Sequence, residues 1–210
     1  MLHLDAIFVG MWTAIQLAAL SFVAATLFGV TIGTFRISPI ASLRAVGTAY
    51  VEFFRSMPIT VLFVFLYFGL PDVKVTIPAF FCAVLGLGLY SGAYIAEAIR
   101  SGFNAVPHGE IEAGRAIGLT QGQLLRCIVL PQAVRMVVAP IGNVFVDLMK
   151  NTSIAYTISV IEITGAATNL VSRYAKPVET FIAAGAAYLI LTIPLGMYFR
   201  RIETRKAIKR

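Results

Sequence analysis

The chain has 210 residues, of which 59% are hydrophobic and 13% are charged, and its formal net charge is +7. A soluble domain carries about a quarter charged residues, so this composition excludes an ordinary soluble fold and indicates a membrane protein in contact with lipid. The positive charge does not indicate nucleic-acid binding, because six of the seventeen basic residues form a membrane-flanking tail: Arg200, Arg201, Arg205, Lys206, Lys209 and Arg210.

Uncharged apolar stretches predict five membrane-spanning helices within a single domain of residues 1–210. Three stretches are long enough on their own: 7–35, 75–96 and 180–199. A fourth stretch, 56–71, reaches spanning length only if it extends back through Glu52 and Arg55. A fifth, 136–161, is interrupted by two charged residues but is needed to connect the preceding loop to the last span. The expected spans are therefore about 7–35, 45–71, 75–103, 132–160 and 179–200.

The distribution of basic residues predicts the orientation of the chain. If the C-terminal tail lies in the cytoplasm, five spans place the N-terminus outside. The inner segments then carry twelve Lys and Arg residues, and the outer segments carry three: Lys74, Arg173 and Lys176. This positive-inside bias places the loop of residues 104–131 in the cytoplasm. The outer segment 159–179, which contains Glu162, either contacts a soluble binding protein or is a solvated connector, and for any single residue we expect the connector.

The loop of residues 104–131 carries a helical pattern of its own, which is uncommon in a simple connector. Glu110 and Glu112 favour the first turn of a short helix, where the helix dipole stabilises carboxylates. Gly118 suits the left-handed backbone that ends such a helix, and Leu119 can then fold back as the hydrophobic contact of the cap. These signals predict a sharp elbow at Gly118.

A second short helix is expected directly after the elbow. Thr120 and Gln123 have the spacing of a capping box, and Pro131 is expected to end the helix. Leu119 would then be exposed at the tip between the two helices. Two interpretations remain open at this point: the elbow either inserts its apolar tip into a cleft of a partner, or lies as an amphipathic hairpin on the membrane surface.

The same loop resembles a known motif. Glu112-Ala113, then Gly118, then Ile128-Val-Leu-Pro131 is similar to the EAA loop of permease subunits in ATP-binding-cassette (ABC) importers. One position departs, because Gly114 stands where the motif has alanine, and a glycine costs about 1 kcal/mol of helix propensity. The resemblance implies a coupling hairpin that docks on a separate ATPase subunit, formed by Glu112, Ala113, Gly114, Gly118, Leu119, Ile128, Leu130 and Pro131.

Three further segments, 50–71, 94–102 and 150–154, resemble polar amino-acid permeases of the histidine/glutamine/arginine type. The resemblance implies an all-α type I importer permease with five spans, which pairs with a second permease subunit, identical or homologous. It also implies an ATPase dimer that binds ATP and Mg, and a periplasmic or lipid-anchored solute-binding protein. The implied function is ATP-driven import of a polar amino acid, or a close derivative, across the bacterial inner membrane.

Charged side chains inside spans are costly in lipid, so each is a functional candidate. Glu52 and Arg55 lie three residues apart, as do Glu97 and Arg100, and each pair can neutralise itself or bridge helices. The densest polar run at membrane depth is a candidate substrate path, in which Asp147 contacts the substrate: Asp147, Lys150, Asn151, Thr152 and Ser153. A self-satisfied salt bridge at a dimer interface is the alternative.

Catalytic and metal chemistry finds little support in the sequence. No phosphate-binding loop of the GxxxxGK[ST] type is present, so ATP hydrolysis is expected in another chain. The two histidines, His3 and His108, and the two cysteines, Cys82 and Cys127, form no metal-ligand or nucleophile pattern, so we expect no metal site, no disulfide and no cofactor on this chain. The competing interpretations are a standalone channel or secondary transporter, and a membrane scaffold without solute flux.

Overall fold

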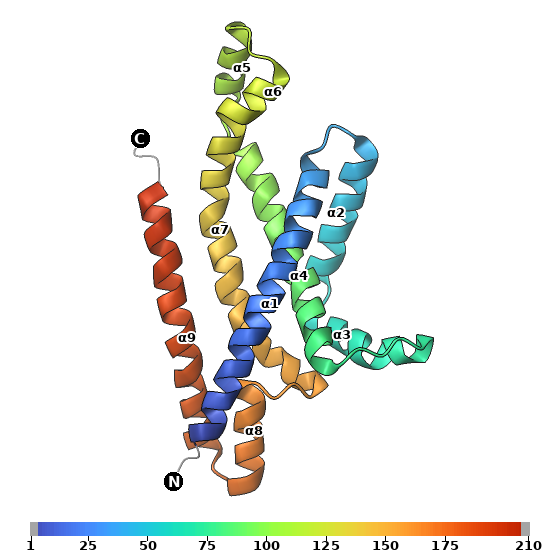
Figure 1. Cartoon of the computed structure of the whole chain (residues 1–210), viewed down its shortest axis with the longest axis vertical. Coiled ribbons are helices and arrows are strands. Elements are labelled where there is room, and N and C mark those ends of the chain that lie inside the picture. Colours follow the sequence, from blue (N-terminus) through green and yellow to red (C-terminus); the bar gives the residue numbers. More distant parts are fainter. Residues whose placement is uncertain (1–3, 207–210) are drawn as a thin grey trace.

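A computed structural model describes residues 4–206, with side chains to residue 202; His3, Lys209 and Arg210 lie outside this region. The described residues form helices joined by short connections (Figure 1). In chain order the elements are α1 (Leu4–Ile37), α2 (Ala41–Ser56), α3 (Ile59–Val64), the π-helical η1 (Phe65–Gly69), the 3-10 helix η2 (Leu70–Val73), α4 (Ala79–Asn104), α5 (His108–Ala116), α6 (Gln121–Leu124), the π-helical η3 (Leu125–Val129), α7 (Leu130–Asn151), the 3-10 helix η4 (Thr152–Ile158), α8 (Ile163–Tyr174) and α9 (Pro177–Lys206).

Four helical runs in the described region are long and apolar enough to cross a membrane: α1, α4, the run from α6 to η4, and α9. A fifth crossing is possible as a broken span, in which α2 and the run from α3 to η2 meet at 100°. The break lies at Met57 and Pro58, which both have extended backbones, because a proline disfavours the helical conformation in the residue before it. The segment expected as one span over 45–71 is therefore bent at a right angle.

The seam between α1 and α4 forms the centre of the bundle, and the two helices pack along each other over much of their length (Figure 1). Small residues make this close approach possible, as is usual between helices in lipid. A Cβ atom added to Gly29 of α1 would lie 2.5 Å from the Cβ of Ile95 in α4. A second apolar cluster packs the base of α3 against α4 and η4, around the fully buried ring of Phe63.

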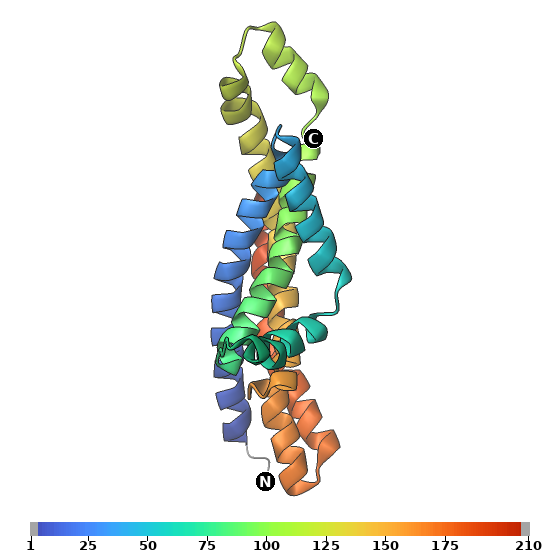
Figure 2. The ribbon, with the colours of Figure 1, turned by 90° about the vertical axis from the view of Figure 1, so that its right-hand side faces the viewer.

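The molecule is elongated, with different structures at its two ends. The hairpin of α5 and α6 projects from one end, and α8 lies at the other, near the start of α1 (Figure 1). The arm from α3 to η2 projects sideways and points towards the viewer in Figure 2. We refer to these as the hairpin end and the α8 end. The expectation that residues 159–179 form a solvated connector is wrong, since they contain the twelve-residue helix α8 with a buried face.

Candidate functional sites

The elbow of the hairpin has the predicted geometry. Gly118 has a φ of +84°, in the left-handed region that favours glycine. Its N–H donates to the Arg115 carbonyl at 3.0 Å, and the N–H of Leu119 donates to the Gly114 carbonyl at 3.1 Å. These two bonds satisfy carbonyls at the end of α5 in the manner of a Schellman cap. The predicted end of the first helix is confirmed.

The capping box that begins the second helix is also confirmed. The Gln123 side chain accepts from the Thr120 N–H at 2.8 Å, and the Gln123 N–H donates to the Thr120 hydroxyl at 3.4 Å. The expectation that Pro131 ends this helix is wrong. Pro131 lies in the first turn of α7, directly after the π-helical η3, and helix continues without a break into α7. A widened turn accommodates a proline that lacks an N–H donor. The second arm of the hairpin is therefore continuous with a membrane span.

Gly114 explains how the two arms of the hairpin pack together. A Cβ atom at this position would lie 2.5 Å from a terminal methyl of Leu124 and 2.7 Å from one of Ile128. The glycine thus lets α5 lie close against α6 and η3. Leu119 folds back towards Gly114 and is half-buried, so the expectation that it forms the exposed tip is wrong. The apolar tip is instead Ile117, which is 78% exposed.

The remaining residues of the hairpin motif divide between its surface and its join to α7. Glu112 and Ala113 are exposed on α5, while Leu130 and Pro131 are exposed where α7 begins. The side chain of Gln132 donates a hydrogen bond to Glu110, which ties α5 to the first turn of α7. The hairpin is therefore anchored to the span rather than attached through a loose linker.

A polar pocket of about 340 Å³ lies between α4 and α7. Its lining residues are Tyr90, Ser91 and Tyr94 of α4 and Val144, Asp147, Leu148, Lys150 and Asn151 of α7. Asp147 and Lys150 form an ion pair at 2.6 Å, and both side chains are more than half exposed. The hydroxyls of Tyr90 and Tyr94 lie 3.1 Å apart. Opposite charges and neutral hydroxyls therefore share one opening at membrane depth.

Three of the five predicted path residues line this pocket, and two do not. Thr152 is fully buried and donates to the Met149 carbonyl at 2.8 Å, because the chain turns into η4 at this residue. Ser153 also lies in η4, outside the pocket. One face of α7 presents Asn143, Asp147 and Lys150 to the surface of the single chain. Polar groups at membrane depth face protein or water, so this face does not contact lipid tails.

A cluster of charges joins α1, α2 and α4 around Glu97. Arg100 pairs with Glu97 at 2.5 Å, as predicted, and Arg36 at the end of α1 pairs with it too. The expected pair of Glu52 and Arg55 is not formed in the described structure, because Arg55 turns to Glu97 at 3.9 Å and lies over the Tyr94 ring. Sequence spacing revealed only the local pair, since Arg36 lies 61 residues from Glu97.

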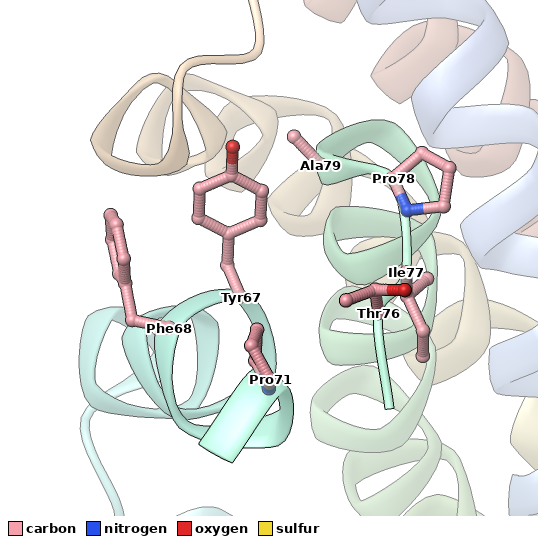
Figure 3. Close-up of a pocket in the computed structure, with 7 residues that line it drawn as sticks. All are labelled: Tyr67, Phe68, Pro71, Thr76, Ile77, Pro78 and Ala79. Carbon is pink, nitrogen blue, oxygen red and sulfur yellow. The ribbon is translucent and has the colours of Figure 1, made fainter. Parts of the chain in front are cut away.

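A second hollow, of about 620 Å³, lies between the projecting arm and the start of α4 (Figure 3). Its lining is aromatic and aliphatic apart from two hydroxyls: Tyr67, Phe68, Pro71, Thr76, Ile77, Pro78 and Ala79. No charged side chain lines it, so it offers no partner for a charged solute. Within residues 4–206 no group of three His, Cys, Asp or Glu side chains is arranged to hold a metal ion, and the two cysteines are unpaired.

Sequence reasoning missed one buried acid. Glu162 was expected to be solvated, but it is fully buried and caps the N-terminus of α8. Burial raises the pKa of its carboxyl group above the ordinary value, and hydrogen bonds from Tyr188 and from backbone N–H groups offset only part of this shift. Glutamate is not among the usual capping residues, so the sequence carried no local signal for this role.

A bundle with a broken span, and a capped hairpin continuous with the next span, defines the chain as a permease subunit of an ABC importer. The match to the family model covers residues 25–208, and the chain belongs to the family described as "Binding-protein-dependent transport system inner membrane component". Such a subunit is a non-catalytic membrane component, and the ATPase is a separate subunit. Importers of this kind also work with a solute-binding protein.

Relatives cover nearly the whole chain. The chain is 35% identical to the "Glutamate transport system permease protein GluC" of Corynebacterium glutamicum over 95% of this chain and 93% of that protein. It is 36% identical to the "Octopine transport system permease protein OccM" of Rhizobium radiobacter over 92% of this chain and 83% of that protein. A solved amino acid ABC transporter with histidines matches with a TM-score of 0.91 and 29% identity, covering 96% of this chain and 94% of that chain. The type I importer permease fold is thereby established.

Proposed function

We propose that this permease subunit imports a polar amino acid or a close derivative. The observation that carries the proposal is the polar pocket between α4 and α7, in which Asp147 and Lys150 stand side by side. The names of relatives more than 30% identical, which refer to glutamate and octopine, support the same class of solute. The apolar hollow of Figure 3 is the larger cavity but has no charged lining.

The pocket suits both charged ends of an amino acid. The Asp147 carboxylate would accept from the ammonium group, while the Lys150 ammonium and the Asn151 amide would donate to the carboxylate. In this structure Asp147 and Lys150 satisfy each other. An exposed pair of this kind is worth little, about 0–1 kcal/mol, so a zwitterion can replace the pair at small cost. The hydroxyls of Tyr90 and Tyr94 would contact the rest of the solute.

The proposed orientation places the hairpin end in the cytoplasm and the N-terminus outside. The excess of basic residues in the segments at the hairpin end supports this orientation. The hairpin would dock on a dimer of ATPase subunits that binds ATP and Mg, and the solute-binding protein would deliver its cargo at the α8 end. Because α6 and η3 continue directly into α7, a displacement of the elbow is carried along one helix to Asp147.

A second permease subunit, identical or homologous, completes the proposed assembly. The exposed polar face of α7, with Asn143, Asp147 and Lys150, supports this part of the proposal, because lipid tails cannot satisfy these groups. Two such faces across from each other would enclose a polar path between the subunits. The path would then be lined by one pocket from each permease subunit.

The proposed function is tested with the tagged chain purified together with its associated subunits and reconstituted in proteoliposomes. We expect a nucleotide-binding subunit in roughly equal amount, and uptake of a labelled solute that requires both ATP and the binding protein. The panel of solutes is L-glutamate, L-glutamine, L-arginine and octopine. Uptake driven by an ion gradient without a nucleotide-binding subunit would establish a standalone transporter instead. An assembled complex that moves no solute would indicate a scaffold.

The role of Asp147 is tested by Asp147→Asn, which keeps the shape of the side chain and removes its charge. We expect ATP-driven uptake to fall at least about tenfold, because a hydrogen bond to a charged group is lost, while the basal ATPase activity is retained. Asp72→Asn is the matched control, since Asp72 is exposed in η2 and lines neither pocket. Unchanged uptake in Asp147→Asn would exclude Asp147 from the substrate path.

A further inference from the structure

A groove of about 450 Å³ lies between α7 and α9, near the end of α9 that points towards the hairpin end (Figure 1). The proposed transport pathway does not use it. Its walls are apolar and come from Ala139 and Val146 of α7 and from Ile193, Gly196 and Met197 of α9. The side chains of Ile193 and Met197 are each 53% exposed. The groove therefore opens sideways from the bundle and not towards its core.

Small residues on the two helices explain why the groove exists. The helices touch at Gly142, where a Cβ atom would lie 2.5 Å from the ring of Phe199. At Gly196, by contrast, a Cβ atom would meet no other atom within 4 Å. Ala139 on the facing wall is also small. The helices are thus held together along one side of the groove, and the space beside them is left unfilled.

The groove lies at the depth of one membrane leaflet. The uncharged stretch of residues 180–199 rises about 30 Å along α9, which equals the thickness of the hydrocarbon core. Arg200 is therefore the first charged residue at the headgroup level of the hairpin end. Thr192, which also lines the groove, lies about 12 Å deeper at 1.5 Å per residue. The groove from Thr192 to Arg200 thus extends over most of one leaflet.

The headgroup end of the groove carries positive charge. Arg200 lines it and is exposed. Arg135 is also exposed and precedes Ala139 by four residues, so it lies on the same face of α7, one turn closer to the hairpin end. Among the side chains that the structure describes, to residue 202, neither guanidinium forms a salt bridge. The sequence after Arg200 adds five basic residues and one acid, Glu203, so the surroundings are strongly positive.

Polar groups inside the groove fit the region just below a headgroup. Asn143 lines the groove at the border of the polar face of α7, next to the contact between Gly142 and Phe199. It therefore lies just below the level of Arg200, where the glycerol esters of a phospholipid follow the phosphate. An amide can donate to ester oxygens, which lipid tails cannot replace. Deeper in the groove, the Thr192 hydroxyl donates to its own helix at 2.8 Å and needs no further partner.

We propose that the groove between α7 and α9 binds an anionic phospholipid of the leaflet at the hairpin end. Arg200 and Arg135 bind its phosphate, and one acyl chain packs against the apolar walls. Charge complementarity favours this occupant over a second copy of the chain, because a symmetric interface here would bring Arg135 and Arg200 of both copies together. The proposal concerns a lipid site and is independent of the transported solute.

Two sets of substitutions separate the headgroup from the acyl chain. Arg135→Gln and Arg200→Gln remove the charge at the headgroup level. Their matched control is Arg44→Gln, because Arg44 is exposed on α2 and donates to backbone carbonyls of neighbouring residues. Gly196→Leu fills the groove without any change of charge. Its matched control is Gly185→Leu, since Gly185 lies on the same helix and also faces open space.

Native mass spectrometry of the assembled, delipidated transporter measures lipid binding. Each basic side chain near the headgroup favours an anionic lipid about fivefold, so the wild type should bind phosphatidylglycerol about twentyfold tighter than phosphatidylcholine. We expect Arg135→Gln and Arg200→Gln each to lose about fivefold for phosphatidylglycerol only, and Gly196→Leu to weaken both lipids. The two controls should bind as the wild type does. Equal affinity of the wild type for both lipids, or unchanged affinity in the Arg135→Gln/Arg200→Gln variant, would overturn the proposal.

Photo-cross-linking locates the lipid. A photoreactive amino acid replaces Met197 in the groove, and Ile182, which is 68% exposed near the other end of α9, is the comparison site. In nanodiscs with equal parts of the two lipids, we expect phosphatidylglycerol to dominate the adducts at position 197 about fivefold and to have no advantage at position 182. If the double arginine variant does not assemble, loss of these adducts in Gly196→Leu decides. Cross-links from position 197 to a second permease subunit would place a subunit interface there and overturn the proposal.

Discussion

The elbow of the hairpin offers the sharpest prediction about coupling. Gly118 has a φ of +84°, and a Cβ atom there would meet no atom within 4 Å. In Gly118→Ala the penalty is therefore purely that of the left-handed backbone, about 1–2 kcal/mol. Since 1.4 kcal/mol corresponds to a tenfold change in an equilibrium constant, we expect the Kd for the ATPase subunit to rise about fivefold to thirtyfold.

The assay is titration of the detergent-purified permease with the ATPase subunit, read by fluorescence anisotropy. Gly109→Ala is the matched control, because Gly109 also faces open space but lies in α5 with an ordinary helical φ. There the same substitution gains about 1 kcal/mol of helix propensity and should leave the Kd unchanged or slightly lower. Membrane insertion should be normal in both variants. Equal affinities for Gly118→Ala, Gly109→Ala and the wild type would refute the argument that the elbow is the docking element.

Two further predictions concern the bundle. Gly29→Ala places a Cβ atom 2.5 Å from the branched Cβ of Ile95, which no rotamer change can relieve, so α1 and α4 must separate by about 1 Å. We expect about 1–3 kcal/mol of destabilisation, seen as a lower thermal midpoint. Gly185→Ala in α9, with no atom within 4 Å, should leave the midpoint unchanged or slightly higher. Glu97→Gln leaves the largely buried Arg36 without its counter-charge, so we expect the free energy of unfolding to fall by about 2 kcal/mol. The exposed Glu52→Gln should lower it by less than about 0.5 kcal/mol. Equal thermal midpoints of the two variants would contradict the role of the Glu97 cluster in joining the helices.

The elements that sequence analysis predicted correctly are those whose signals lie within a few residues. The capping box needs only Thr120 and Gln123, and the elbow needs only a glycine after a helical run, so both are visible in the sequence. The pair of Glu97 and Arg100 lies within one helical turn and was visible for the same reason.

The features that sequence analysis missed depend on tertiary structure. Arg36 pairs with Glu97 only because α1 packs on α4, and no local sequence pattern predicts this ion pair. A charged residue outside the spans is ordinarily solvated, so the sequence around Glu162 gave no sign that it would be buried between α1, α8 and α9. Pro131 is ambiguous by nature, since a proline is compatible with the first turn of a helix as well as with its end. Only the fold showed that helix continues through it.

Docking of the hairpin on an ATPase, from which motion passes along α7, is tested by cross-linking from the hairpin tip. A photoreactive amino acid replaces Ile117, which is 78% exposed, and Leu119, which folds back, serves as the comparison site. We expect an efficient cross-link from position 117 to the nucleotide-binding subunit, which changes in yield when ATP is added, and a weak one from position 119. Cross-links from position 117 to lipid alone would contradict it and establish a hairpin that lies on the membrane surface.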